Sequence, residues 1–231
     1  MLFTVAEKIQ ETPDTVTLVF AMQKPVVYKP GQFMMASVTT GKKELLRRAY
    51  TLSSTPTRPE TIAMTVKLYA QGCCSPKLGA LKPGEKLEMT GPYGTFYFTE
   101  TQDDVVLLAG GSGIAPMRSI LLYVLDKKLP NKVTVLYSSR TTEDIIFYQE
   151  LQKLAATHKQ VRCFFTLTRK KPDEPWNGLT GRIDAAMVKR CVPNVLASQY
   201  FVCGPPEMVT NTIQILQEFG VDKKKIKKEL W

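Results

Sequence analysis

Three short stretches of this chain hold residue types that bind phosphates and flat rings. The first ends at Ser54 and places an arginine, an aromatic ring and a hydroxyl at Arg48, Tyr50 and Thr51, with Ser53 as a further candidate. Arginine offers a planar fork of donors to a phosphate, a tyrosine ring can stack on a flat heterocycle, and a threonine hydroxyl both donates and accepts hydrogen bonds. Alternation along a strand puts Arg48 and Tyr50 on one face. Such tetrapeptides also occur in ordinary strands.

The second stretch is Gly72-Cys73-Cys74-Ser75 followed by Pro76. It predicts a short helix with Ser75 as the N-cap and Pro76 at the first position. Free amide groups at a helix start can bind a pyrophosphate. The alternative is a capped helix that only links two strands.

The third stretch is a glycine-rich turn between an apolar run and a predicted helix. It contains Gly110, Gly111, Ser112, Gly113, Ile114, Ala115 and Pro116. Glycine lets backbone approach a diphosphate closely, and a helix start supplies amides with partial positive charge. The spacing differs from the Gly-x-Gly-x-x-Gly fingerprint, so a standard dinucleotide-binding turn is not predicted. The alternative is a plain turn from strand to helix.

A cysteine ends a later predicted strand, in the run Cys203-Gly204-Pro205-Pro206, and Met208 follows it. Ligands of open α/β sheets lie outside the carboxyl ends of the strands, so Cys203 is expected to meet a nicotinamide. The alternative is a cysteine that serves only as a small buried hydrophobe. Together these stretches predict a flavoprotein that takes a hydride from a nicotinamide coenzyme.

The surrounding pattern predicts two domains. Short β-rich runs separated by turns such as Lys82-Pro83-Gly84 predict an antiparallel β-barrel over residues 1–101. Strands alternate with helices afterwards, which predicts a parallel α/β sheet over residues 102–231. The expected strands there are 105–109, 133–137, 161–167 and 200–203, and the expected helices are 115–126, 143–156, 184–191 and 206–219.

Composition narrows the function further. The chain has 231 residues and a formal net charge of +10, with five lysines between residues 223 and 228. Five scattered cysteines match neither a disulfide framework nor a metal-binding pattern, so no metal is expected. No apolar run is long enough to span a bilayer, and no signal peptide is evident, so a cytoplasmic protein is expected. No nucleic-acid-binding motif accompanies the charge, which suits an acidic protein partner or a solvated face.

The motifs resemble those of the ferredoxin–NADP reductase superfamily over nearly the whole chain. Its flavin domain carries Arg-x-Tyr-Ser/Thr and then Gly-x-x-Ser, and its nucleotide domain carries Gly-x-Gly-Ile/Thr-x-Pro. The resemblance implies that Arg48 binds the flavin phosphate, Tyr50 packs on the isoalloxazine and Thr51 approaches flavin N5. It implies FAD rather than FMN, held also by Gly72, Cys73, Cys74 and Ser75 and by the strand residues Val66 and Lys67. It places Gly111, Ser112, Gly113, Ile114, Pro116, Cys203, Gly204, Pro205 and Met208 at the coenzyme, with Cys203 beside the hydride path.

The last residues also resemble the superfamily, because the chain ends Glu229-Leu230-Trp231. Plant-type reductases end in Glu-x-aromatic, and their aromatic residue covers the flavin. Some bacterial members end in Trp near the adenine. Trp231 is therefore expected at the flavin ring or its adenine, with packing on the barrel as the alternative, and Glu229 joins Thr51 and Cys203 as a candidate catalytic residue.

Coenzyme choice depends on two clusters that follow predicted strands, Ser139-Arg140 and Thr168-Arg169. A 2′-phosphate needs basic and hydroxyl groups, and neither cluster contains an acidic residue. NADPH is therefore preferred and NADH stays possible. Solvated turns are the alternative.

The sequence thus predicts a reductase that passes a hydride from NAD(P)H to FAD and then single electrons to a separate acidic carrier, such as ferredoxin or flavodoxin. The alternatives are a reductase component of an oxygenase and a non-catalytic electron-transfer subunit of a larger complex.

Overall fold

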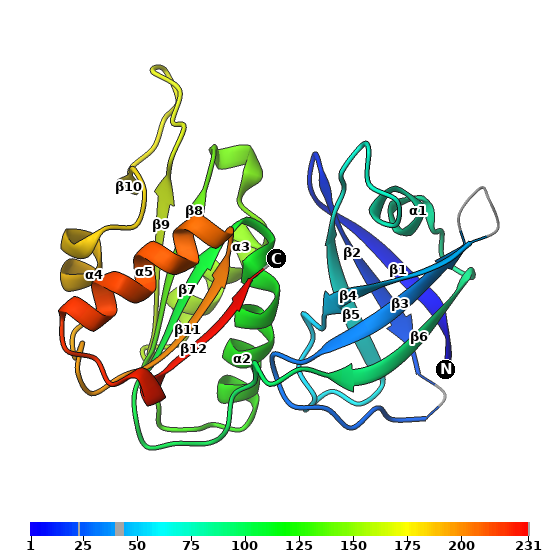
Figure 1. Ribbon diagram of the computed structural model, residues 1–231, viewed down its shortest axis with the longest axis horizontal. Coiled ribbons are helices and arrows are strands. Elements are labelled where there is room, and N and C mark those ends of the chain that lie inside the picture. The colour runs from blue at the N-terminus through cyan, green and yellow to red at the C-terminus, as the bar shows by residue number, and fades with distance from the viewer. Residues whose placement is uncertain (23, 40–43, 231) are drawn as a thin grey trace. The chain divides into compact units, whose positions relative to one another are not determined.

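The computed structural model describes residues 1–22, 24–39 and 44–230. It divides into two compact units (Figure 1). The first contains Met1–Thr99 together with Arg118–Lys127, and the second contains Glu100–Met117 and the described residues from Lys128 onward. The later turns of helix α2 (Ile114–Asp126) are therefore counted with the first unit.

The first unit is built on an antiparallel sheet of six strands in the order β4-β3-β6-β1-β2-β5. Leu52, just after β4, forms an antiparallel bridge to Met64 on β5, which joins the two ends of the sheet into a barrel. The strands are β1 (Leu2–Thr12), β2 (Thr15–Ala21), β3 (Phe33–Thr39), β4 (Leu45–Thr51), β5 (Thr61–Lys67) and β6 (Lys86–Tyr93), and the one helix of residues 1–99 in the described chain is α1 (Ser75–Ala80).

Alternating side chains fill the barrel. On β2, Val16, Leu18 and Phe20 share one face and are fully buried. Met34 on β3 and Met64 on β5 join the same core from facing strands. Alternation of side chains along the strands therefore forms the inner face of the barrel, and the expected antiparallel fold is confirmed.

The second unit is a parallel sheet of six strands in the order β10-β9-β8-β7-β11-β12. Its strands are β7 (Val105–Gly110), β8 (Val133–Ser139), β9 (Val161–Leu167), β10 (Leu179–Thr180), β11 (Gln199–Gly204) and β12 (Ile226–Leu230). Besides α2, its helices are α3 (Tyr148–Thr157), α4 (Ala185–Cys191) and α5 (Pro206–Glu218), with short 3-10 turns η1 (Gly111–Gly113), η2 (Thr142–Asp144) and η3 (Lys223–Lys225). The expected parallel α/β fold is confirmed.

Helices pack on both faces of this sheet (Figure 1). Val188 of α4 and Leu216 of α5 share a buried cluster with Val106 and Leu108 of β7. On the opposite face, Tyr148 of α3 packs edge-to-face on Phe165 of β9. Every residue of β7 is buried, as expected for a central strand covered on both sides.

One expected helix start was wrong, and one strand was not expected. The helix expected at 143–156 begins only at Tyr148, because Phe147 has a left-handed backbone (φ 59°) that separates it from the turn η2. Strand β12 was not among the expected strands, and it carries Lys227 and Lys228 of the terminal lysine run. Among the helices that the structure describes, none is both long and apolar enough to cross a membrane.

Candidate functional site

Strand β4 carries the first candidate group. Arg48 and Tyr50 lie opposite Ala36 and Met34 of β3 in the strand register. The Arg48 side chain is exposed, and one guanidinium nitrogen donates to the carbonyl of Arg47 at 2.9 Å. Tyr50 is half-buried against the barrel core. Burial raises the pKa of Tyr50 to about 12, so its hydroxyl stays protonated at neutral pH.

The second flavin stretch lies beside the first. The negative charges of Cys74 and Tyr69 add to the rise in the pKa of Tyr50, whereas the positive charge of Arg48 lowers it. Cys74 also shares the buried cluster against which Tyr50 packs. The fold thus brings a cation, two phenol rings and the start of α1 together. This donor set fits a phosphate-bearing flat heterocycle such as a flavin.

The start of α1 differs in detail from the expectation. Cys74 is the N-cap and Ser75 is the first helical residue, so the expected N-cap at Ser75 was wrong. The Ser75 hydroxyl instead accepts from the backbone N–H of Tyr69 at 3.1 Å. A Cβ on Gly72 would lie 2.7 Å from that hydroxyl, so a side chain at this position would displace the hydroxyl from its hydrogen bond. Cys73 is exposed.

A polar network that sequence reasoning missed holds the chain just after β4. Within the first unit, Arg118 donates to the carbonyl of Ser53 at 2.8 Å, and the buried Ser119 hydroxyl donates to the carbonyl of Ser54 at 2.5 Å. The Ser54 hydroxyl in turn accepts from the backbone N–H of Ala63 at 2.9 Å. These bonds fix the end of the strand that carries Arg48.

Three predicted flavin residues have structural partners of their own. The fully buried Ser53 hydroxyl accepts from Thr65 at 2.9 Å. Val66 is buried in the barrel core, and Lys67 pairs with Asp14 at 2.9 Å. Their side chains are thus already occupied, and their roles at a flavin stay predictions.

In the second unit, the glycine-rich turn packs against the end of β11. A Cβ on Gly113 would lie 2.3 Å from the carbonyl oxygen of Cys203, and one on Gly204 would lie 3.0 Å from the nitrogen of Gly110. A Cβ on Gly110 would lie 2.5 Å from the Met208 sulfur. The close approach of these chain segments to one another is thus a second reason for glycine here, beside the expected approach of a diphosphate.

The backbone conformation of the glycine-rich turn and the helix that follows it suit the binding of an anion. Gly111 has a left-handed backbone (φ 53°), and its carbonyl accepts from the buried Tyr137 hydroxyl at 2.9 Å. Ile114 and the buried Pro116 open helix α2, whose 13 residues give it a full helix dipole. Because the turn and the Cys203 segment meet at the carboxyl ends of β7 and β11, the fold unites two stretches that are about 90 residues apart in the sequence.

Cys203 and Glu229 face each other across β11 and β12 in the strand register. Cys203 is buried, and this burial, together with the negative charge of Glu229, raises the pKa of its thiol. Burial raises the pKa of Glu229 to about 7. A carboxyl group that changes protonation near neutral pH therefore lies beside a protonated thiol. Trp231, the other terminal candidate, lies outside the described residues.

The two coenzyme-choice clusters meet at the ends of β8 and β9. The Thr168 hydroxyl donates to the carbonyl of Ser139 at 3.2 Å, and the N–H of Arg169 donates to the carbonyl of Arg140. The Ser139 hydroxyl is buried without a hydrogen-bond partner among the residues described. An unsatisfied buried hydroxyl of this kind suits a polar ligand atom.

The structure also brings an acidic residue to this place. Arg140 pairs with Asp144 at 2.7 Å. Burial opposes ionisation of Asp144, but the hydrogen bond from Arg140 holds its pKa below the ordinary value. Neither cluster contains an acidic residue in the sequence, but the turn η2 returns the carboxylate of Asp144 to Arg140, so the fold adds an acidic group beside the first cluster.

Comparison with known proteins identifies the domain type of each half of the chain. The oxidoreductase FAD-binding domain matches residues 2–98, and the oxidoreductase NAD-binding domain matches residues 107–214. The chain belongs to the ferredoxin–NADP reductase superfamily. FAD and a pyridine nucleotide are thus the cofactor types of this superfamily member.

Individual relatives have several roles. The chain is 33% identical over 219 residues to the glycine betaine monooxygenase reductase subunit of Chromohalobacter salexigens, in an alignment that covers 93% of this chain and 59% of the relative. It is 32% identical over 193 residues to one component of the Na(+)-translocating NADH-quinone reductase of Methylococcus capsulatus, where the alignment covers 78% and 47% respectively. The chain thus spans only about half of the length of such relatives.

A solved structure matches along the whole chain. The FAD/NAD-binding domain of the nitric oxide dioxygenase from Vibrio cholerae superposes with a TM-score of 0.89 at 25% identity, covering 100% of this chain and 98% of that one. A ferredoxin NADP+ reductase from Neisseria gonorrhoeae superposes with a TM-score of 0.79 at 24% identity, covering 100% and 98% in the same order, which shows the shared fold.

Proposed function

We propose that this chain is an NAD(P)H-dependent flavoprotein reductase that passes electrons to a separate carrier. Residues 1–101 are proposed to bind FAD, and residues 102–231 are proposed to bind the coenzyme. The observation that carries the proposal is the packing of the glycine-rich turn against Cys203, with Glu229 as the register partner of that cysteine. Bound FAD would supply hydride acceptance and one-electron transfer.

The residues of the chain have distinct parts in this proposal. Arg48 neutralises a flavin phosphate, the protonated Tyr50 packs on the ring system, and the Thr51 hydroxyl hydrogen-bonds to a ring nitrogen. The amides at Ser112 and Gly113 bind the coenzyme diphosphate. The neutral, buried Cys203 gives the nicotinamide an uncharged surface, while Glu229 holds or releases a proton beside it.

For the coenzyme we propose NADPH. Arg169 is exposed at the end of β9, and the unsatisfied Ser139 hydroxyl lies at the end of β8. Both suit a 2′-phosphate. Asp144 competes for Arg140, so NADH remains the alternative.

For the acceptor we propose an acidic electron carrier such as ferredoxin or flavodoxin. The net charge of +10 and the exposed Lys223, Lys224 and Lys228 support an acidic partner. The monooxygenase reductase relatives favour a second candidate, a reductase component of an oxygenase. The five cysteines are free, which accords with a reducing compartment such as the cytoplasm.

A visible absorption spectrum tests the proposal. We expect the purified protein to bind FAD and its flavin absorbance to bleach when NADPH is added without oxygen. Flavin that binds but bleaches with neither NADPH nor NADH would instead indicate the non-catalytic electron-transfer role. Reduction of an added acidic ferredoxin, compared with a basic carrier, tests the acceptor.

A further inference from the structure

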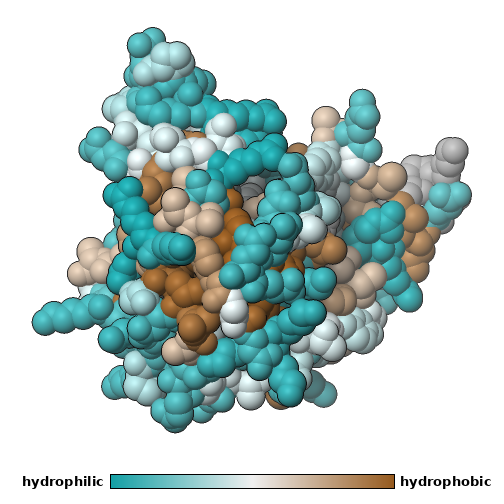
Figure 2. All heavy atoms as spheres, turned by 60° about the vertical axis from the view of Figure 1, so that its left-hand side comes forward, coloured by the Kyte–Doolittle hydropathy of each residue, from teal (hydrophilic) through white to brown (hydrophobic). Residues whose placement is uncertain are grey.

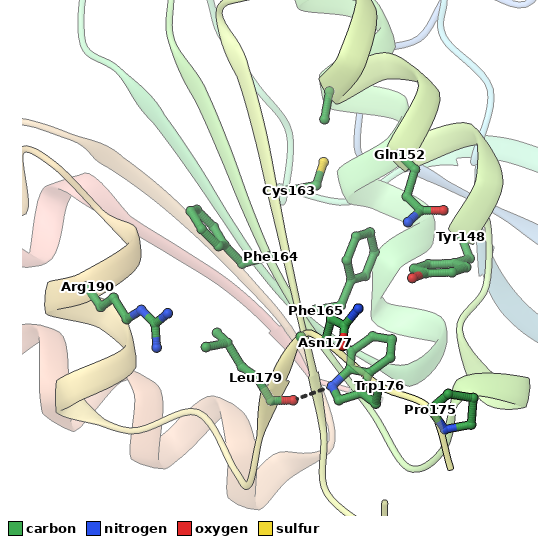
Figure 3. Close-up of a pocket in the computed structure, with 12 residues that line it drawn as sticks. Tyr148, Gln152, Cys163, Phe164, Phe165, Pro175, Trp176, Asn177, Leu179 and Arg190 are labelled. Atoms are coloured by element: carbon green, nitrogen blue, oxygen red, sulfur yellow. Dashed lines mark hydrogen bonds between the residues drawn. The ribbon is translucent and has the colours of Figure 1, made fainter.

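A groove of about 660 Å³ follows the outer edge of β9 in the second unit (Figure 3). Cys163, Phe164 and Phe165 of β9 form its floor. Figure 3 shows Phe164 directed toward the side of Arg190 on α4, while Cys163 and Phe165 point toward the opposite side, where α3 lies. The remaining lining residues are Tyr148, Gln152, Ala155, Pro175, Trp176, Asn177, Gly178 and Leu179.

The floor of the groove is a strand edge that is largely unpaired. Strand β10 pairs only with Thr166 and Leu167 at the end of β9, so no described strand covers Val161 to Phe165 on that side. The Leu167 carbonyl accepts from Gly181 on this side. Peptide groups alternate sides along a strand, so the N–H and C=O of Cys163 face the groove as well. Unpaired peptide groups of this kind are a template for another strand.

One wall of the groove is apolar and rigid. The Tyr148 and Phe165 rings meet edge-to-face with centroids 4.9 Å apart, and the Trp176 ring lies 6.2 Å from Tyr148. The Trp176 indole donates to the Leu179 carbonyl at 2.8 Å, which fixes its orientation. Such pre-arranged aromatic rings suit apolar side chains of a ligand.

The other wall is cationic. Next to the groove, outside the residues that line it, Arg162 lies over the Phe164 ring, 5.2 Å from its centroid, and donates to the Cys191 carbonyl. Arg190 is exposed and lines the groove from α4. Figure 2 shows this side of the molecule, where hydrophobic side chains lie recessed among hydrophilic ones. A ligand with apolar groups on one face and acidic groups on the other matches these two walls.

The β9 edge lies between side chains of α3 and α4, and this limits the kind of strand that can pair with it. Side chains of α3 and α4 flank the β9 edge, so the β9 edge of a second copy would meet these helices before its own backbone reached the floor. The second copy would also bring another Arg162 to an already cationic wall. A single extended segment avoids both problems, and β10 shows that this edge accepts a strand.

We propose that the groove along β9 binds an extended peptide segment of a partner protein, in which acidic and apolar residues alternate, as an added strand. The segment pairs with the peptide group of Cys163. Its apolar side chains pack on Tyr148 and Phe165, and its carboxylates face Arg190. Because side chains alternate between the two faces of a strand, one alternating sequence satisfies both walls.

The test is binding of the blocked, labelled peptide Glu-Val-Glu-Val-Glu-Val-Glu, followed by fluorescence anisotropy at about 0.15 M salt, where distant charges are screened. We expect the alternating peptide to bind. A control peptide of the same composition, with all its valines in one block and all its glutamates in another, should not bind. Equal binding of both peptides would overturn the proposal, because it would show attraction by net charge alone.

A pair of neighbouring alanines on α3 locates the site. Ala155 lines the groove, whereas Ala156 is exposed and does not. Ala155→Phe should fill the groove and weaken binding about tenfold or more, and Ala156→Phe should leave it unchanged. The Arg190→Glu variant changes an exposed residue, so its fold should be retained; it should lose the acidic peptide and gain the lysine–valine counterpart. Unchanged binding in both groove variants, or dimerisation that Ala155→Phe abolishes, would overturn the proposal.

Discussion

Cys203 and Glu229 are register partners on the adjacent parallel strands β11 and β12, where Cys203 is buried and Glu229 is half-buried. Burial favours the neutral form of each group, and the charge of Glu229 further disfavours a thiolate at Cys203. Well below neutral pH the pair therefore carries no charge. Near neutral pH the carboxyl group ionises first, because its pKa lies near 7 while that of the thiol is raised.

This burial makes stability depend on the protonation of Glu229. Its pKa is about 7 in the folded chain and near 4.5 when exposed, so the folded state binds more protons between these values. The free energy of unfolding should therefore fall as pH rises through this window, by at most about 3 kcal/mol. Glu229→Gln should remove that fall, as measured by urea unfolding from pH 5 to 8. The exposed Glu218→Gln is the control, and an identical pH profile in Glu229→Gln would refute the argument.

Cys203 should affect hydride transfer more than coenzyme binding. In Cys203→Ala, we expect the limiting rate of flavin reduction at saturating NADPH to fall about tenfold, because the smaller side chain supports the nicotinamide less well. Stopped-flow absorbance measures both the rate and the apparent dissociation constant. Cys191→Ala is the matched control, since Cys191 is also buried but lies on α4. An unchanged limiting rate would count against the assignment.

Arg48 should anchor the flavin phosphate. Arg48→Ala should weaken FAD binding by about 1.5–3 kcal/mol through loss of a charge-assisted hydrogen bond. Arg47→Ala removes the same charge from the next position, which alternation places on the other face of β4. Titration of the apoprotein with FAD, followed by quenching of flavin fluorescence, compares the two. Equal losses would point to general charge rather than to a specific anchor.

Strands could be predicted from the sequence where their own composition was enough to identify them. The run Val105–Ala109 is buried on both sides of the sheet, and its continuous apolar composition predicts such a strand. Strand β12 could not be read in this way, because Lys227, Lys228 and Glu229 dominate it and its place depends on pairing with β11. The start of α3 depended on one left-handed residue, Phe147.

The motifs of the candidate site could be predicted from the sequence, but the contacts between them could not. The Cys203 segment and the glycine-rich turn were both identified, yet their packing against each other is a property of the assembled sheet. The bonds from Arg118 and Ser119 to carbonyls 65 residues earlier carry no sequence pattern. The same holds for Asp144, whose effect on Arg140 depends on the path of one turn.

Arg118 should position β4 rather than touch the cofactor. Arg118→Met removes the bond to the Ser53 carbonyl, and we expect weaker FAD binding and a changed flavin circular dichroism spectrum, because the strand end loses its anchor. Arg58→Met is the control, since it breaks the exposed ion pair between Arg58 and Asp126 in the same unit. A variant that loses only thermal stability and keeps the wild-type flavin spectrum would show a purely structural role.

The choice of coenzyme should depend on Arg169 and on the competition between Asp144 and a 2′-phosphate for Arg140. Arg169→Ala should raise the KM for NADPH by about tenfold, since a charge-assisted bond to phosphate is worth about 1.5–3 kcal/mol, and should leave the KM for NADH nearly unchanged. Asp144→Asn should act in the opposite direction, because it removes the carboxylate that holds Arg140 and leaves that guanidinium for the phosphate. Steady-state kinetics with both coenzymes measure the two effects. Equal changes for NADPH and NADH in both variants would show that these residues only shape the turn and that the 2′-phosphate binds elsewhere.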